Sequence, residues 1–172
     1  MSFNELIEQT KVALQEDPNA TEVSLETGSE LLEGTEVEVR VGERRIRADE
    51  PEKLGGTDTA PNPVEYALAA LGSCQAITYR VWADRLGLSL DRVRVHVAGD
   101  LDLKGFFGLD PSTRPGFGGV DVRVELDGPE EEESYKRLFQ VVNRHCPVLD
   151  LFENPVPVEL RFGAEEGGTS DG

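Results

Sequence analysis

Six segments of the chain are predicted to be β-strands, and most of them alternate hydrophobic and polar residues. A period of two is typical of a half-buried strand, because successive side chains point to opposite faces. The six segments are residues 23–31, 36–41, 44–48, 93–103, 120–126 and 156–162. Gly42 and Glu43, between the second and third segments, predict a tight hairpin turn. The second and third segments are therefore expected to pair as an antiparallel hairpin.

Three helices are predicted from a 3.6-residue periodicity and from residues that start or stop helices. They cover residues 5–15, residues 63–86 and a segment from Glu130 to Cys146. Asn62 and Pro63 supply an N-cap and a first helical residue for the long helix, and Gly87 terminates it. Its first part, residues 66–77, is apolar on every side, which is typical of a helix buried all round. One small sheet covers a single side, so we expect a second helix and a second subunit to cover the rest.

These elements predict a single α+β domain, and the apolar helix predicts an obligate homodimer. Residues 1–20 are expected to form a helical N-terminal extension. Residues 21–162 form the domain itself. Residues 163–172 are polar and acidic and are predicted to be a disordered tail.

The chain is strongly acidic, with a formal net charge of −17. Nucleic acids and anionic membranes attract positively charged surfaces, so neither is an expected partner. A run of about 18 uncharged apolar residues, which a membrane span needs, does not occur in the sequence. Residues 1–5 contain no basic region followed by an apolar stretch, so the sequence predicts no secretory signal and a cytoplasmic protein.

The two cysteines, Cys74 and Cys146, are the main candidates for chemistry. No CxxC pair and no cluster of further ligands accompanies them, so the sequence predicts neither a metal site nor a cofactor site. From the residues alone two interpretations stay open: inert thiols in a buried core, or a reactive pair. Cys74 lies in the middle of an apolar helix, so it needs a nearby cation if it is to form a reactive thiolate.

An arginine is the expected cation, because arginine stays charged in a dry site. The preceding hairpin carries four candidates, Arg40, Arg44, Arg45 and Arg47. Arg40 is the first choice, although strand alternation turns it toward water unless a dimer partner covers that face. Glu65, in the first turn of the Cys74 helix, is the carboxylate expected to hold the arginine. Cys146 precedes Pro147 at the predicted C-terminal end of a helix, which disfavours a thiolate and suits a resolving thiol.

Two motifs of the chain resemble the signatures of the OsmC/Ohr family of hydroperoxide reductases. The first runs from Gly55 to Tyr66 as GGTDTAPNPVEY and continues with LGSC at residues 71–74. The second is HCPV at residues 145–148. Their order and separation make the resemblance specific, and it spans about residues 35–162. Val64 stands between Pro63 and the glutamate, a pattern similar to the broader OsmC-like branch of the family.

The resemblance implies an OsmC-like fold, in which two antiparallel sheets enclose the central helices of an intertwined homodimer. It implies that an organic hydroperoxide oxidises Cys74 to a sulfenate and that Cys146 then closes a disulfide with it. It also implies that a small dithiol, of the lipoyl type or similar, restores the thiols during oxidative or osmotic stress. The alternatives on the same fold are a small-molecule binding module and a stress-associated protein with inert thiols.

Overall fold

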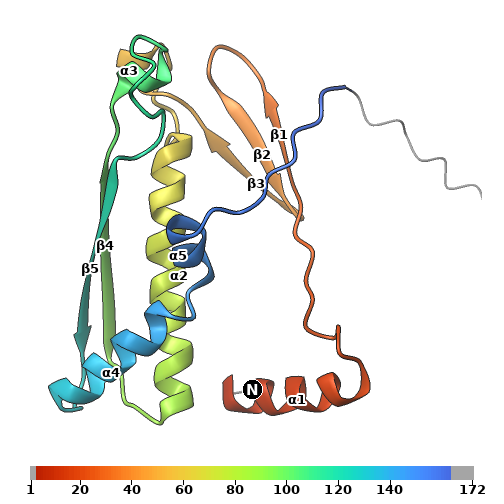
Figure 1. Cartoon of the computed structure of the whole chain (residues 1–172), viewed down its shortest axis with the longest axis vertical. Coiled ribbons are helices and arrows are strands. Elements are labelled where there is room, and N and C mark those ends of the chain that lie inside the picture. The colour runs from red at the N-terminus through yellow and green to blue at the C-terminus, as the bar shows by residue number, and fades with distance from the viewer. Residues whose placement is uncertain (1–2, 164–172) are drawn as a thin grey trace, which may run out of the picture.

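The computed structural model describes residues 3–163 and consists of helices and two antiparallel sheets, so the predicted α+β class is confirmed (Figure 1). In chain order the elements are α1 (Phe3–Glu16), β1 (Thr27–Leu31), β2 (Val37–Val41), β3 (Arg44–Ala48), the 3₁₀ helix η1 (Glu52–Leu54), α2 (Pro63–Leu86), β4 (Arg92–Asp100), α3 (Leu103–Phe106), β5 (Gly119–Asp127), α4 (Glu132–Asn143) and α5 (Pro147–Glu153). In Figure 1 the long helix α2 lies between the β4–β5 pair and the β1–β3 sheet. The predicted tail lies outside the described range from residue 164 onward.

The predicted hairpin of residues 36–48 is confirmed as β2 and β3 of a three-stranded sheet, with β1 as the third strand. Gly42 makes its turn at a φ of 59°, a conformation that glycine adopts without steric cost. Ion pairs cross the hairpin on the predicted polar side, joining Glu38 to Arg45 and Glu36 to Arg47. The second sheet pairs two nine-residue strands, β4 and β5, which are joined by residues 101–118.

The helix α2 begins and ends where the sequence predicts. The Asn62 side chain accepts a hydrogen bond from the N–H of Glu65 (2.9 Å), and the Glu65 carboxylate accepts one from the N–H of Asn62 (2.8 Å). This reciprocal capping box satisfies two of the N–H groups that a helix start leaves unpaired. At the other end, Gly87 takes the left-handed conformation (φ 67°) and closes the last turn.

The core lies where α2, α4 and the β4–β5 pair meet. Tyr79 and Ala83 of α2 pack with Leu90, Leu138 and Val142, and all five side chains are buried. The second helix that α2 was expected to need is therefore α4, which covers its C-terminal half. The apolar stripe predicted around Leu138 and Val142 is the face of α4 that makes this contact.

Two predictions near the C-terminus are wrong. The helix expected to reach Cys146 ends at Asn143, and Pro147 begins a new helix, α5, instead of only stopping the old one. Proline suits the first position of a helix because its fixed φ is helical and its missing N–H has no intrahelical partner there. The strand expected over residues 156–162 is not formed, since that segment pairs with neither sheet of the chain.

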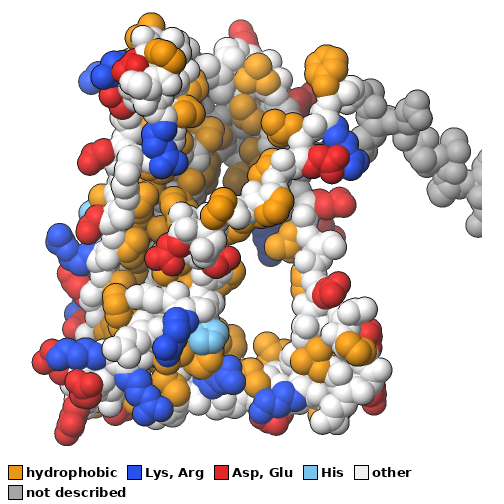
Figure 2. Space-filling model, viewed as in Figure 1, with side chains coloured by type: hydrophobic (Ala, Val, Ile, Leu, Met, Phe, Trp, Pro, Cys, Tyr) orange, Lys and Arg blue, Asp and Glu red, His pale blue; other side chains and the backbone are white. Residues whose placement is uncertain are grey.

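The structure leaves much apolar surface uncovered. Figure 2 shows an opening through the molecule above α1, with hydrophobic side chains beside it. Leu160, in the segment predicted as a strand, is 90% exposed, and Ile77, in the middle of α2, is 64% exposed. The accessible surface is 13,444 Å², whereas a folded monomer of 18.8 kDa typically shows about 8,300 Å². One chain alone therefore does not bury the faces that the sequence marks as apolar.

No helix within residues 3–163 combines the length and the apolar character that crossing a membrane requires.

Candidate functional site

The structure brings Cys74 and Cys146 together. Cys74 lies on α2 and is partly buried, whereas Cys146 is only 2% exposed and forms the N-cap residue of α5. The two thiols are unbonded, and Cys74 lies near enough to the Cys146 thiol to raise its pKa. Residues 72 positions apart in the sequence thus form a pair of adjacent thiols, one of which is open to solvent.

The surroundings of Cys146 differ from those predicted. Burial raises the pKa of the Cys146 thiol above its ordinary value, and the adjacent Cys74 adds to this shift. The N–H groups of Leu149 and Val148, in the first turn of α5, act in the opposite direction and lower the pKa. The expectation that Cys146 ends a helix is therefore wrong: it precedes one, on the side where backbone N–H groups favour a negative charge.

Two buried polar side chains lie on α2 close to the cysteines. Gln75 is 1% exposed and Tyr79 is fully buried, and neither the Gln75 Oε1 nor the Tyr79 hydroxyl has a hydrogen-bond partner among residues 3–163. Burial raises the pKa of Tyr79 above its ordinary value, and Cys146 adds to the shift. Neither residue was predicted from the sequence. Gln75 could have been identified, because it is a polar residue inside the run predicted to be buried on every side.

A stack of side chains fixes the chain segment that leads into Cys146. The rings of Trp82 and His145 lie 4.3 Å apart, and the Arg85 guanidinium lies 4.4 Å from the centre of the Trp82 ring. The His145 Nδ1 donates a hydrogen bond to the Val141 carbonyl (2.8 Å). Because Trp82 and Arg85 belong to α2, this stack holds the end of α4 against the helix that carries Cys74.

The other two predicted site residues, Glu65 and Arg40, lie away from the cysteines within one chain. Glu65 is exposed at the start of α2, where its carboxylate serves the capping box. Arg40 lies on β2 and extends along β1, where its guanidinium would touch a Cβ placed on Gly28. Within residues 3–163, no ion pair joins Arg40 to a carboxylate.

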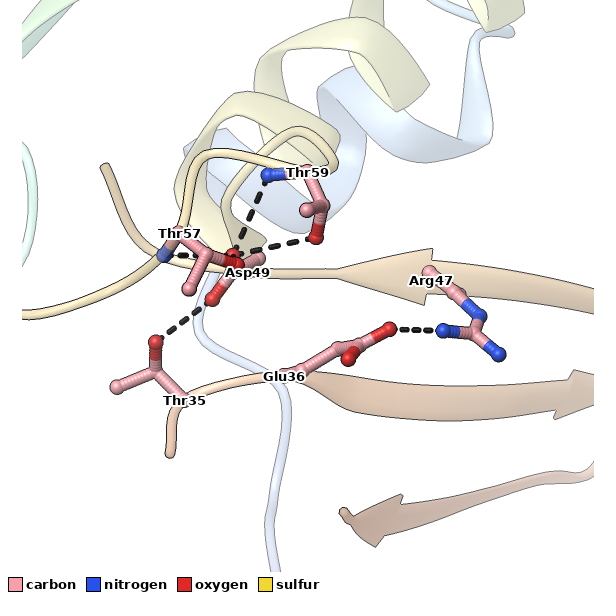
Figure 3. A network of polar contacts seen from close by, with 6 residues as sticks. All are labelled: Thr35, Glu36, Arg47, Asp49, Thr57 and Thr59. Carbon is pink, nitrogen blue, oxygen red and sulfur yellow. Dashed lines mark hydrogen bonds and ion pairs between the residues drawn. The ribbon is translucent and has the colours of Figure 1, made fainter. Parts of the chain in front are cut away.

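The loop that precedes α2 is held by Asp49, a third residue that was not predicted from the sequence (Figure 3). One carboxylate oxygen accepts hydrogen bonds from the Thr35 hydroxyl (2.7 Å) and the Glu50 N–H (2.8 Å). The other accepts from the N–H and hydroxyl groups of Thr57 and Thr59, at 2.7–3.3 Å. The hydrogen bonds from Thr35 and then Thr57 hold the pKa of Asp49 well below its ordinary value. Asp49 thereby ties the hairpin to the GGTDTAP segment of the first motif.

A pocket of about 760 Å³ is lined by residues of α2 and α5 that are close in sequence to the two cysteines. Its lining includes Leu71, one helical turn before Cys74, and Val148 and Leu149, directly after Cys146. Phe117, from the loop between β4 and β5, adds an aromatic wall. The lining is mainly apolar, so the pocket suits the hydrocarbon part of a small molecule.

Within residues 3–163, histidine, cysteine and carboxylate side chains form no group of three or more that could hold a metal ion.

Comparison with known proteins places this geometry in a family. The family model described as OsmC-like protein matches residues 56–161, which include both cysteines. An OsmC-like protein from Mycoplasma pneumoniae has the same fold, with a TM-score of 0.68 and 16% identity over 78% of this chain and 91% of that one. An organic hydroperoxide resistance protein OsmC from Legionella pneumophila gives a TM-score of 0.58 and 21% identity, over 76% of this chain and 89% of that one.

A putative organic hydroperoxide resistance protein from Vibrio cholerae, crystallised with captopril in one of its active sites, is similar in fold as well. Its TM-score is 0.58, with 17% identity over 78% of this chain and 88% of that one. No curated protein sequence matches the chain. The family match covers more than half of the chain and agrees with the structural neighbours. The chain therefore belongs to the OsmC-like protein family.

Proposed function

We propose that this protein reduces organic hydroperoxides with its two thiols. One observation carries the proposal: a partly exposed thiol, Cys74, lies next to a buried one, Cys146, in a fold whose relatives include organic hydroperoxide resistance proteins. Adjacent thiols on separate helices can close a disulfide by a small movement. Thiols that serve only to pack the core do not have to lie next to each other.

The reaction proceeds in two steps in this proposal. The Cys74 thiolate attacks the outer oxygen of the hydroperoxide, the O–O bond breaks, and the alcohol leaves after taking up a proton. Cys74 is then a sulfenic acid. The Cys146 sulfur attacks the Cys74 sulfur, the S–O bond breaks, and hydroxide leaves as water with the proton that Cys146 gives up. The two thiols thus supply the two electrons that reduce the hydroperoxide.

The hydrocarbon part of the substrate occupies the apolar pocket in this proposal. The pocket lining runs from Leu71 to the first turn of α5, so it includes residues close in sequence to both cysteines. Arg114 and Glu153 are the charged residues of its lining. A substrate with an apolar body and a hydroperoxide group at one end fits this distribution better than hydrogen peroxide, which has no apolar part.

A homodimer completes the site in our proposal. The chain exposes 13,444 Å², well above the roughly 8,300 Å² of a compact monomer of its mass. An excess of this size is typical of what obligate dimers bury. Because no ion pair within residues 3–163 joins Arg40 to Glu65, we infer that the Arg40 of the partner activates Cys74, with Glu65 holding it.

Regeneration requires a reductant that can enter a narrow site. Cys146 is buried, so we propose a small dithiol of the lipoyl type as the physiological reductant. We also propose a cytoplasmic location, where the reducing environment keeps the thiols free between turnovers.

Thiol titration before and after reaction with cumene hydroperoxide tests the proposed function. We expect the full-length protein to lose two titratable thiols per chain and to regain both on addition of dihydrolipoamide. A protein that keeps both thiols in the presence of excess hydroperoxide would overturn the proposal.

Binding of an apolar small molecule, without thiol chemistry, is the second candidate. The pocket beside Leu71 favours it, because an apolar pocket of this volume can hold a ligand whatever the cysteines do. The same titration separates the two functions, since a binding module keeps both thiols.

A further inference from the structure

Tyr79 is the one tyrosine in the described chain whose hydroxyl has no hydrogen-bond partner. The Tyr66 hydroxyl donates to the Arg47 carbonyl (2.7 Å), and the Tyr135 hydroxyl donates to the Ser89 carbonyl (2.9 Å). The Tyr79 hydroxyl is completely buried and donates to nothing within residues 3–163. Leaving such a group unpaired costs about 1–3 kcal/mol in general, so a retained buried hydroxyl calls for an explanation.

Tyr79 lies on the helix that carries Cys74 and packs against the segment that precedes Cys146. Helical side chains tilt toward the N-terminus of their helix, so the Tyr79 ring runs along α2 toward the level of Gln75 and Cys74. Val142, which packs with Tyr79 in the core, lies four residues before Cys146. Cys146 is also the ionisable side chain whose charge acts on Tyr79.

We propose that the Tyr79 hydroxyl donates a hydrogen bond to the Cys146 sulfur when that sulfur ionises to attack the Cys74 sulfenic acid. The inference rests on the proposed function, because it assigns a residue to the second step of that reaction. A neutral thiol is a weak acceptor, and a thiolate is a strong one. The hydroxyl therefore gains its partner only as charge develops on the sulfur, and this selective stabilisation is what accelerates a step.

The step balances without a proton from Tyr79. Cys146 loses its proton, its sulfur forms the S–S bond, the S–O bond of the Cys74 sulfenic acid breaks, and the released hydroxide and the Cys146 proton form water. Cys146 is oxidised and the Cys74 sulfur is reduced. Burial raises the pKa of Tyr79, so its hydroxyl stays protonated at neutral pH and acts as a donor throughout.

Tyr79→Phe tests this role, because it removes the hydroxyl and keeps the ring. The full-length variant is mixed with one equivalent of cumene hydroperoxide, and the sulfenate and the disulfide are followed by rapid quenching and mass spectrometry. We expect first oxidation of Cys74 at the wild-type rate and disulfide closure slowed at least tenfold. Closure should also need a higher pH, because the thiolate has lost a stabilising donor.

Tyr135→Phe is the matched control. It removes the hydroxyl that bonds to Ser89, so it should lower the free energy of unfolding and leave closure unchanged. Tyr79→Phe should not lower that free energy, since its hydroxyl has no partner to lose. The other ionisable groups around Cys146 are the same in both variants. Cys74 is the reacting partner, the ring of His145 lies against Trp82, and Asp150 accepts a hydrogen bond from Asn154.

Closure by Tyr79→Phe at the wild-type rate and with the wild-type pH dependence would overturn the inference. Equal slowing in both variants would overturn it too, because the effect would not depend on proximity to Cys146. A wild-type protein that forms no sulfenate at all marks failure of the proposed function instead, so the two failures are distinct.

Discussion

Ile77 gives the sharpest test of whether α2 is covered by a second chain. It lies at the middle of α2, three residues after Cys74, and its side chain is 64% exposed in the single chain. Ala70 and Ser73, which are also exposed, precede it on the same side of the helix. An isoleucine left in water at this position has no explanation within one chain.

The expected magnitude follows from its exposed area. Fully burying such a side chain contributes about 1.5–3 kcal/mol, so burying the exposed part contributes about 1–2 kcal/mol. A twofold-symmetric dimer buries the residue twice, which gives about 2–4 kcal/mol. Ile77→Ala should therefore weaken the dimer by a factor of about 30 to 1,000 in the dissociation constant. Ile77→Leu conserves the apolar volume and is the matched control.

Size-exclusion chromatography with light scattering, over a range of protein concentrations, measures this effect. The wild type and Ile77→Leu should elute near 38 kDa, twice the chain mass of 18.8 kDa. Ile77→Ala should dissociate into monomers at higher protein concentrations than the wild type and Ile77→Leu do, and its thermal midpoint should fall more steeply on dilution. A folded wild-type monomer at low micromolar concentration would refute the dimer, and an Ile77→Ala dimer of unchanged affinity would refute burial of α2 at this point.

Four further predictions concern the site and the core. Cys74→Ser should abolish the first oxidation by hydroperoxide, whereas Cys146→Ser should retain it and accumulate a sulfenate that dimedone traps, as mass spectrometry would reveal. Arg40→Ala should slow that oxidation about 100-fold or more, as loss of a preorganised donor typically does, and a wild-type rate in stopped-flow assays would refute the assignment. The pKa of Asp49 is depressed in the folded state, so its carboxylate stabilises the fold above the ordinary aspartate pKa, and acidification through the folded pKa removes this contribution. Urea unfolding at several pH values should therefore show that the difference in unfolding free energy between wild type and Asp49→Asn becomes smaller in acid. Leu138→Ala should cost about 2–5 kcal/mol in urea unfolding, because Leu138 is fully buried, and a smaller loss would mean that the α2–α4 contact contributes little.

Elements whose capping residues and hydrophobic periodicity lie in their own sequence were predictable from local rules. Asn62, Pro63 and Gly87 mark both ends of α2, and strict alternation marks the hairpin around Gly42, so these predictions are confirmed. The break at Asn143 was missed because a proline gives two signals, the end of one helix and the start of another. Whether a proline also starts a new helix depends on whether the residues after it can pack against another element, as α5 packs against α2.

The candidate site was predictable only in part, because adjacency across 72 residues is set by packing. The two cysteines were found from their motifs, and the α2–α4 core brings them together. The structural roles of Asp49 and Tyr79 were not predicted, because the residues around them, such as Thr35 and Val142, are distant in sequence. The segment 156–162 alternates like a strand, and within one chain it has no strand to pair with.

The stack that holds the end of α4 contains the only tryptophan of the protein, Trp82. Its indole therefore accounts for the whole tryptophan emission of the chain, with no background from other sites. The ring lies 4.3 Å from His145, the residue directly before Cys146. Any shift of the α4–α5 connection changes the polarity around the indole and its quenching by the imidazole. The protein thus carries a native fluorophore at its thiol pair, and its redox state can be followed optically in real time without a label.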